Sequence, residues 1–309
     1  MRFHATGIGG LGAALAACAL SACTVNVNTE GATASETRKF TVAGAPTVNL
    51  DTFDGAIEVH SWDRNEVEVI VDKQAQDEAQ LTKIVVEQSQ DGDHITLRVR
   101  GPAESARSGL VIGVSFSPRA TLRVALPKSA TLELKSSDGT ITVEDVAGAV
   151  TVQSGDGSII GTRLSGDLRA RTDDGSIRLR EMTGKVDAET LDGSITVNGT
   201  LTHLRAKTGD GSVRIGAESG SALGDDWNVE TGDGTVEVRL PQGMAAVVDA
   251  STADGVIRSN YPGLTVPPRH EDDDRSERDD DRRDLKATLG AGGHTLRVRT
   301  RDGTIRFES

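Results

Sequence analysis

Short runs of alternating apolar and polar residues recur along most of this chain, and Asp-Gly pairs separate many of them. From residue 138 onward the pattern Asp-Gly-[Ser/Thr]-[Ile/Val] returns with a constant step of 18. The regularly spaced pairs are Asp138-Gly139, Asp156-Gly157, Asp174-Gly175, Asp192-Gly193 and Asp210-Gly211. Alternation with period two is typical of β-strands, and Asp-Gly favours a tight turn because glycine adopts positive φ at little steric cost. Each unit therefore predicts two short strands joined by an Asp-Gly corner.

The repeat extends to positions far from the corner. Counted from each aspartate, the third position is Ile or Val, the twelfth Val or Leu, the fourteenth Val or Ala, and the sixteenth Ser or Thr. Columns of like residues at a fixed period indicate units that stack. No segment between these strands is long enough for a crossover helix. We therefore predict an all-β, single-stranded parallel β-solenoid, with about 18 residues per coil and ~4.8 Å between coils.

Two other solenoid classes fit the spacing less well. Left-handed hexapeptide helices have coils of the same length, but the sixth position after each aspartate, which should be small or aliphatic, holds Glu144, Thr162, Arg180 and Asn198. Calcium-binding nonapeptide rolls need an aspartate in every nonapeptide, and only one Asp-Gly column occurs per coil here. The pattern therefore excludes both.

The columns expected to face outward carry charge and Ser/Thr. At the thirteenth and fifteenth positions the charge alternates from coil to coil, with the pairs Arg169/Arg171, Asp187/Glu189 and Arg205/Lys207. Opposite charges would then meet across neighbouring coils, and a slip by one coil would oppose like charges. We interpret the alternation as a device for registry; chance alternation on a solvated face is the alternative.

The N-terminal part of the domain, residues 40–128, has a less regular pattern. Residues 48–59 match one coil corner around Asp54-Gly55, whereas Asp91-Gly92 lacks the surrounding columns and is typical of a hairpin turn. Residues 74–83 form the only modest helix candidate. We expect irregular strands with antiparallel hairpins here, leading into regular coils over 129–309.

The C-terminal part continues the repeat with an interruption. Further Asp-Gly pairs begin at Asp233, Asp254 and Asp302, and the last of these steps equals one period plus an insertion. Within it, residues 269–284 carry nine acids and five bases and no aliphatic residue. This composition predicts a disordered loop over about 264–286, or alternatively a cation- or partner-binding loop. Residues 296–307 are then expected to close the final coil.

Residues 1–22 are typical of an export signal. An apolar run over 8–20 is too short to span a bilayer, and Leu20-Ser21-Ala22-Cys23 resembles the bacterial lipobox, in which the cysteine receives diacylglycerol. We predict a signal peptide over 1–22, lipidation at Cys23 and a flexible tether over 23–39. Lipidation at Cys18, which also follows a lipobox-like pattern, and an ordinary secretory signal remain alternatives. Thr24, which is not aspartate, favours the outer membrane in a Gram-negative cell.

Composition excludes several kinds of chemistry. The net charge of −13 argues against nucleic-acid partners, and aromatic residues make up only 3% of the chain. Cys18 and Cys23 are the only cysteines, and no histidine has metal-ligand spacing to another histidine or a cysteine. We predict no catalytic residues, no metal and no cofactor. The aspartates of the five regular corners are expected to accept N–H bonds within their own turns; weak divalent-cation bridging between corners is the alternative.

The run Ala125-Leu126-Pro127, Leu132-Glu133-Leu134 and Asp138-Gly139-Thr140-Ile141, followed by the repeats, resembles the bacterial putative-adhesin domain of unknown function across residues 40–309. The resemblance implies a cell-envelope domain of repeated β-strands, with no catalytic residues to carry over. We expect a non-catalytic, extracytoplasmic lipoprotein acting as a structural, adhesive or protein-interaction scaffold. Its partners would be the membrane, through its anchor, and an unknown envelope or surface protein. A polysaccharide-active β-helix enzyme and an envelope-stress sensing or regulatory protein are the alternatives.

Overall fold

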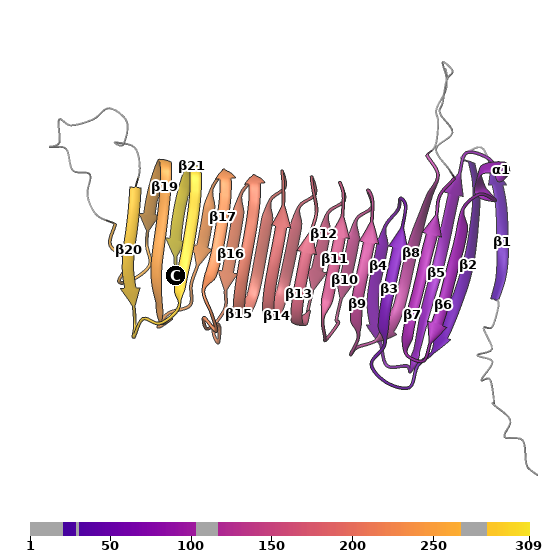
Figure 1. The fold of residues 1–309 in the computed structure, drawn as a ribbon, viewed down its shortest axis with the longest axis horizontal. Helices are drawn as coiled ribbons and strands as arrows, with labels where there is room; N and C mark the ends of the chain where they lie inside the picture. The colour runs from indigo at the N-terminus through magenta and orange to yellow at the C-terminus, as the bar shows by residue number, and fades with distance from the viewer. Residues whose placement is uncertain (1–20, 29–30, 103–116, 267–282) are drawn as a thin grey trace, which may run out of the picture.

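The computed structural model describes residues 21–28, 31–102, 117–266 and 283–309. Strands lie side by side along one long axis, and among the described residues a single short helix, α1 (Glu78–Leu81), accompanies them (Figure 1). This confirms the all-β prediction. The strands are β1 (Ser21–Asn28), β2 (Gly31–Thr41), β3 (Thr47–Thr52), β4 (Ile57–Trp62), β5 (Glu66–Ala75), β6 (Val85–Asp91), β7 (His94–Arg100), β8 (Arg119–Pro127), β9 (Thr131–Ser136), β10 (Ile141–Glu144), β11 (Val150–Ser154), β12 (Ile159–Thr162), β13 (Ser165–Arg171), β14 (Ile177–Thr190), β15 (Ile195–Asp210), β16 (Val213–Ala217), β17 (Trp227–Asp233), β18 (Val236–Arg239), β19 (Ala246–Ser259), β20 (Arg283–Leu289) and β21 (Thr295–Glu308).

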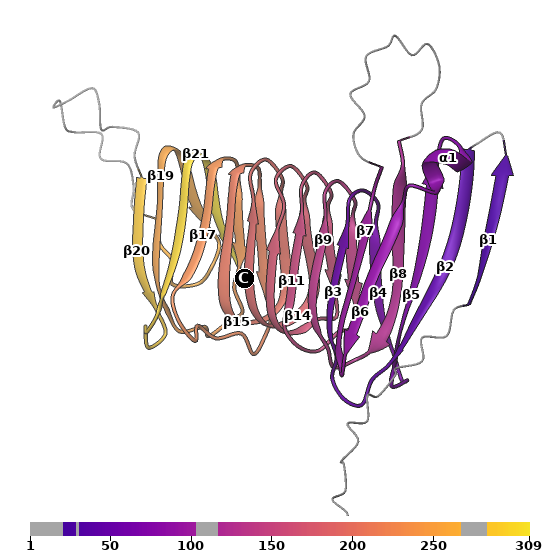
Figure 2. The ribbon, with the colours of Figure 1, turned by 45° about the vertical axis from the view of Figure 1, so that its right-hand side comes forward.

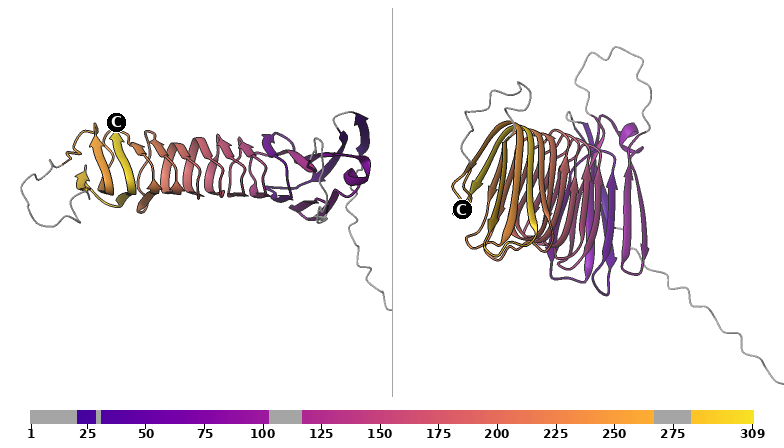
Figure 3. Two further views of the ribbon diagram at one scale, coloured as in Figure 1. Left: turned by 90° about the horizontal axis from the view of Figure 1, so that it is seen from above. Right: turned by 60° about the vertical axis from the view of Figure 1, so that its left-hand side comes forward.

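Two strand ladders form the opposite sides of the stack (Figures 2 and 3). Face A contains the strands that lead into the Asp-Gly corners, and its central members are β9, β11 and β13. Face B contains the strands that leave the corners, and its central members are β10 and β12. The long strands β14 and β15 take part in both faces. All pairings among these coils are parallel, as the solenoid prediction requires.

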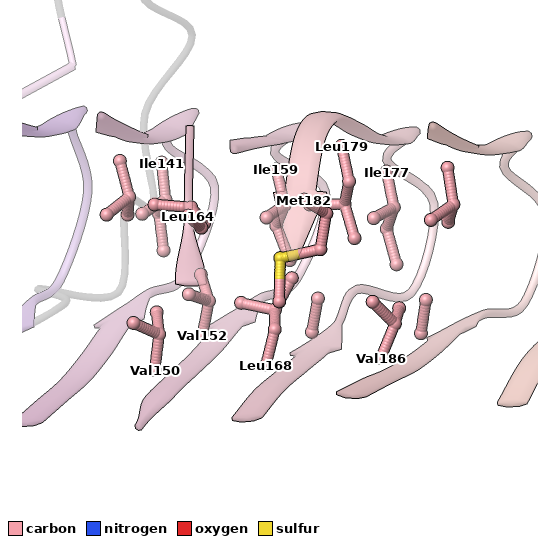
Figure 4. Packing of buried hydrophobic residues seen from close by; sticks show 14 of the residues in the cluster. Ile141, Val150, Val152, Ile159, Leu164, Leu168, Ile177, Leu179, Met182 and Val186 are labelled. Atoms are coloured by element: carbon pink, nitrogen blue, oxygen red, sulfur yellow. The ribbon is translucent and has the colours of Figure 1, made fainter. Parts of the chain in front are cut away.

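The predicted register of the repeat is confirmed at residue level. On face B, Ile141, Ile159, Ile177, Ile195 and Val213 lie opposite one another in successive strands. On face A the same holds for Val150, Leu168, Val186 and Leu204. Every residue of both columns is buried, and the two columns point toward each other across the interior (Figure 4). Each fully buried aliphatic side chain contributes about 1.5–3 kcal/mol, so stacked rungs of small apolar residues stabilise a fold that has few aromatics.

The N-terminal end mixes a true coil with antiparallel strands. The coil corner predicted at residues 48–59 is made by β3 and β4, and this Asp54 coil pairs in parallel with β9 and β10. Beyond it lie β7 and β8, which also run parallel to that coil. Antiparallel strands then extend both faces, β6 on face A and β5, β2 and β1 on face B. The hairpin turn at Asp91-Gly92 is confirmed, because β6 and β7 are antiparallel with Asp91 opposite His94.

The prediction of a flexible tether over 23–39 is wrong for the part of it that the structure places in strands. Residues 31–39 belong to β2, which pairs with β5 along its whole length and buries Ala32 and Glu36. The backbone of residues 21–28 forms β1, antiparallel to β2. Thr-, Ser- and Ala-rich segments are compatible with strands when a ready edge is available, and β5 provides that edge. Residues 1–20 of the predicted signal peptide lie outside the described residues.

The order of the C-terminal coils in space differs from their order in sequence. β21 pairs in parallel with β17 and β18 on one side and with β19 on the other. The coil of Asp302 thus lies between those of Asp233 and Asp254, so the prediction that it closes the stack is wrong. The outermost strand among the described residues is β20, antiparallel to β19.

The outward charges of β21 match those of the strands on either side of it. Its outward residues Arg297 and Arg299 lie opposite Asn228 and Glu230 of β17, and on the other side Arg299 pairs with Asp249 of β19 at 2.7 Å. Stacking in sequence order would instead place Asn228 opposite Asp249 and Glu230 opposite Ser251, without these contacts between opposite charges.

The predicted disordered insertion over 264–286 is too long at both ends. Leu264 is buried, and Arg283 begins β20. Residues 267–282, which hold most of the charged run, lie outside the described residues.

Candidate functional site

The Asp-Gly corners contain a buried ladder of hydroxyl groups. In the coil before Asp174, the Thr172 hydroxyl accepts the N–H of Gly175 at 3.3 Å and lies 2.9 Å from the carbonyl oxygen of Gly157 in the preceding coil. The same pair of contacts recurs at Ser136, Ser154 and Thr190. This Ser/Thr column is buried, so the expectation that it faces outward is wrong. It satisfies backbone groups that would otherwise be buried without a partner.

Glycine is required at the corners because adjacent coils almost touch there. A Cβ atom added to Gly157 would lie 2.1 Å from the carbonyl oxygen of Gly139, and one added to Gly193 would lie 1.9 Å from that of Gly175. Both atoms struck are backbone atoms, so no side-chain movement relieves the clash. The predicted corner glycines Gly139, Gly157, Gly175 and Gly193 are buried, and Gly211 is partly exposed.

The aspartates of the five regular corners are all exposed. The first four turn glycines donate their N–H to the Ser/Thr hydroxyl. The hydroxyl, and not the carboxylate as expected, therefore accepts this N–H bond within the turn. The related Asp54 is half-buried, and its burial, together with the negative charge of Asp138, raises the pKa of its carboxyl above the usual range. The column thus projects carboxylates into solvent.

The charged columns of face A form ion pairs between coils. Arg169 lies 3.7 Å from Asp187, and Asp187 in turn lies 4.0 Å from Arg205. Two residues further along the same strands, Arg171 lies 3.6 Å from Glu189. The predicted alternation therefore produces contacts between opposite charges. Exposed pairs of this kind are individually worth only ~0.2–1 kcal/mol, so registry remains our interpretation of their role.

The corners opposite the Asp-Gly side contain a feature that the sequence did not reveal. Asp145, Arg163 and Glu181 adopt positive φ of 58°, 53° and 53°, which residues other than glycine rarely do. Arg163 donates two hydrogen bonds to Asp145, at 2.6 and 2.8 Å, and these hold the pKa of the Asp145 carboxyl below its usual range. These three residues lie seven positions after the corner aspartates, and their charges alternate from acid to base to acid. That alternation was the signal in the sequence for the ion pair, although not for the positive φ.

The remaining candidates for chemistry are dispersed. His203 pairs with Asp225 at 2.7 Å, and His294 lies 3.6 Å from Asp226. Within the described part of the chain, no group of three or more His, Cys, Asp or Glu residues is arranged to hold a metal ion. In the same part, no helix is long and apolar enough to cross a membrane. Cys23 falls in β1, of which only the backbone is described, and His270 lies outside the described residues.

Comparison with protein families identifies the fold. The Toastrack DUF4097 model matches residues 43–308, which is most of the chain. The chain belongs to this family. The Toastrack domain is a parallel β-solenoid-like fold, which agrees with the stacked coils, and the resemblance predicted from the sequence is confirmed.

Solved structures similar to this Toastrack chain include three bacterial proteins. A putative cell adhesion protein from Clostridium sporogenes shares 14% identity over 89% of this chain and 98% of its own, with a TM-score of 0.29. Putative adhesins from Bacteroides fragilis and Parabacteroides merdae each share 9% identity, with TM-scores of 0.33 and 0.30; they cover 88% and 89% of this chain and 96% of their own. No curated protein matches the chain.

Proposed function

We propose that this Toastrack protein is a non-catalytic scaffold, anchored by lipid at Cys23 on the extracytoplasmic side of a bacterial membrane. In a Gram-negative cell that membrane would be the outer membrane. The observation that carries the proposal is the form of the molecule: coils linked continuously by hydrogen bonds, filled with aliphatic residues and charged on the outside. Such a stack holds outward groups at fixed spacing of about 4.8 Å.

The position of Cys23 gives this scaffold a direction. Among the described strands, β1 is the outermost of face B at one end of the stack, and β20 is the outermost of face A at the other (Figure 1). A lipid on Cys23 would therefore attach the stack by its N-terminal end. The C-terminal coils would then stand away from the membrane, separated from the Asp54 coil by roughly 40 Å at ~4.8 Å per coil.

Lipid labelling tests the anchor. In cells that express the full chain and are fed radioactive palmitate, we expect labelled protein in the membrane fraction. Cys23→Ala should abolish the label, whereas Cys18→Ala, the matched control from the competing lipobox, should leave it unchanged. Labelling that depends on Cys18, or that persists in Cys23→Ala, would contradict the anchor.

The scaffold role needs a separate test. Purified protein incubated with a panel of envelope polysaccharides should release no sugar fragments. Cross-linking in intact cells should recover one partner reproducibly with the wild-type protein, and an excess of added soluble protein should compete that partner away. Release of oligosaccharides would favour the enzyme alternative.

A further inference from the structure

A row of outward residues directly precedes the aspartates of the Asp-Gly corners; we call it the corner row. Backbone N–H···O=C bonds connect its members from Ser137 to Gly209. The strand register places Gly232 beside Gly209, and Arg301 between Gly232 and Ala253. In spatial order the corner row is Ser137, Gly155, Asp173, Leu191, Gly209, Gly232, Arg301 and Ala253.

Leu191 is the apolar projection of this row. It is 50% exposed, and only one other large apolar residue among those described, Val85, is equally exposed. The neighbouring members of the row are Asp173 on one side and Gly209 on the other. A leucine raised between a charged residue and a glycine has no apolar neighbour in the row to cover it.

A hollow of about 530 Å³ lies just beyond Gly209 on the same edge. Gly209, Gly232 and Ala253 contribute small residues to its lining. Lys207, Arg299 and Arg301 add positive charge to the lining, and Glu230 adds one negative charge. The hollow therefore offers room for an apolar side chain beside a rim whose net charge is positive.

The corner row is complementary to itself about Gly209. One coil from Gly209, Leu191 lies on one side and the small residue Gly232 on the other. Two coils away, the acid Asp173 and the base Arg301 lie on these same two sides, and three coils away lie the small residues Gly155 and Ala253. If a two-fold axis passes beside Gly209, each position of the row faces its counterpart on the other side of Gly209 in a second copy. The positions match because successive coils are equally spaced.

We propose that two copies of this chain associate through the corner row, with Leu191 of each copy seated over Gly232 of the other. Asp173 of each copy then meets Arg301 of the other. Arg301 already contacts Asp233 at 3.0 Å and lies 3.7 Å from Asp302, but its side chain is 67% exposed and its guanidinium has donors to spare for a further carboxylate. Gly209 lies on the axis, where the absence of a side chain lets the two backbones approach.

The symmetry makes the two stacks antiparallel. An axis that lies in the plane of the contact, at right angles to the long direction of the stack, reverses that direction in the second copy, so the two N-terminal ends lie at opposite ends of the pair. If Cys23 is the lipid anchor, which rests on the proposed function, a pair formed this way joins two facing membranes. The association itself does not depend on the anchor.

Native mass spectrometry of the full chain, purified in detergent as the cell processes it, tests the association. We expect a dimer for the wild type and at least a tenfold weaker dimer for Leu191→Asp. Val85→Asp, the same change at the other exposed apolar residue, is the matched control and should leave the dimer intact. A wild-type protein that stays monomeric at micromolar concentration, or equal effects of the two substitutions, would overturn the proposal.

A charge exchange separates the interface from folding. Asp173→Arg should weaken the dimer, and the double variant Asp173→Arg/Arg301→Asp should restore it if both retain the wild-type circular dichroism spectrum. Should Arg301→Asp disturb the fold, Asp173→Arg measured in low and high salt (about 0.05 and 1 M NaCl) still decides, because the loss must shrink as salt screens the repulsion. A loss that salt does not change would contradict the contact.

Membrane joining is tested last, with vesicles carrying the lipidated protein. Wild-type vesicles should cluster and increase in turbidity, whereas Leu191→Asp vesicles should not. Dimers without clustering would refute the antiparallel arrangement or the anchor while leaving the corner-row contact standing, and the palmitate experiment distinguishes these two.

Discussion

The central coils and the C-terminal end of this protein use the same repeat in different ways. Between residues 138 and 215, each coil lies on the one that precedes it in sequence, and the strand pairings follow the 18-residue step of the repeat except at residues 182–184, whose partners are 17 residues further on. At the C-terminal end, β21 enters between β17 and β19, two strands that precede it in the chain. The aliphatic columns are alike in both regions. The difference teaches that apolar columns specify how coils stack but leave open which coils become neighbours, and that the outward charges of β21 match the place where it lies.

The ends of the stack also differ from its central coils in their strand edges. Central coils expose no strand edge, because each has a neighbour on both sides. Among the described strands, antiparallel β6 and β1 lie at one end of the two faces; at the other end, antiparallel β20 lies outermost on face A and β19 lies outermost on face B. Short charged edge strands hinder further pairing, and β20 carries Arg283, Asp284 and Lys286.

The largest expected effect comes from removing β21. Deleting residues 295–308 takes away the buried Leu296, Val298, Ile305 and Phe307, a loss on the order of 6–12 kcal/mol at about 1.5–3 kcal/mol per side chain. β19 would lose its parallel partner, so its amides should exchange with deuterium rapidly while those of the central coils stay protected. Deleting residues 23–28, which removes most of the outer strand β1, is the control and should change the exchange of neither the β19 amides nor the central-coil amides. Protected β19 amides without β21 would contradict the inserted order.

A smaller but still severe effect is expected at a central corner. Gly157→Ala places a methyl group 2.1 Å from the Gly139 carbonyl oxygen and should lower the free energy of unfolding by about 3 kcal/mol, measured by urea denaturation. The control is Gly44→Ala at the N-terminal end, where the new methyl would lie 3.4 Å from an Asp93 side-chain oxygen. Equal stabilities of the two variants would refute the close contact between coils.

Removing one hydroxyl from the ladder should cost less than the methyl clash. Thr172→Val keeps the shape of the side chain but leaves the Gly175 N–H and the Gly157 carbonyl without their partner, for a loss of about 2 kcal/mol. Thr172→Ser retains the hydroxyl and should remain within about 1 kcal/mol of the wild type. If valine were tolerated as well as serine in thermal melts, the ladder would not stabilise the corner.

The smallest expected effect concerns the charged columns. Asp187→Lys places a third cation between Arg169 and Arg205 and should destabilise the fold by about 1 kcal/mol at low salt. The difference from the neutral control Asp187→Asn should largely vanish in about 1 M NaCl, because salt screens exposed charges. A salt-independent difference would show that packing, not charge, is responsible.

The sequence predicted the coils well because the apolar columns repeat with one period, and that period leaves a single register. It could have placed the Ser/Thr column correctly too, since the sixteenth position shares its parity with the buried fourteenth. It could not determine the position of β21 from apolar residues, because Leu296 and Val298 fit beside β17 and β19 equally well. The positive φ of Arg163 escaped prediction because no turn residue marks it.

Coil deletion tests the central claim, that whole coils are interchangeable units stacked in one register. Removing residues 157–174 joins Asp156 to Gly175 and keeps every column aligned, whereas removing residues 157–165 shifts the columns by half a coil. We expect the whole-coil variant to show a cooperative thermal melt close to that of the wild type and the half-coil variant to lose that transition. Two variants damaged to the same degree would contradict the account.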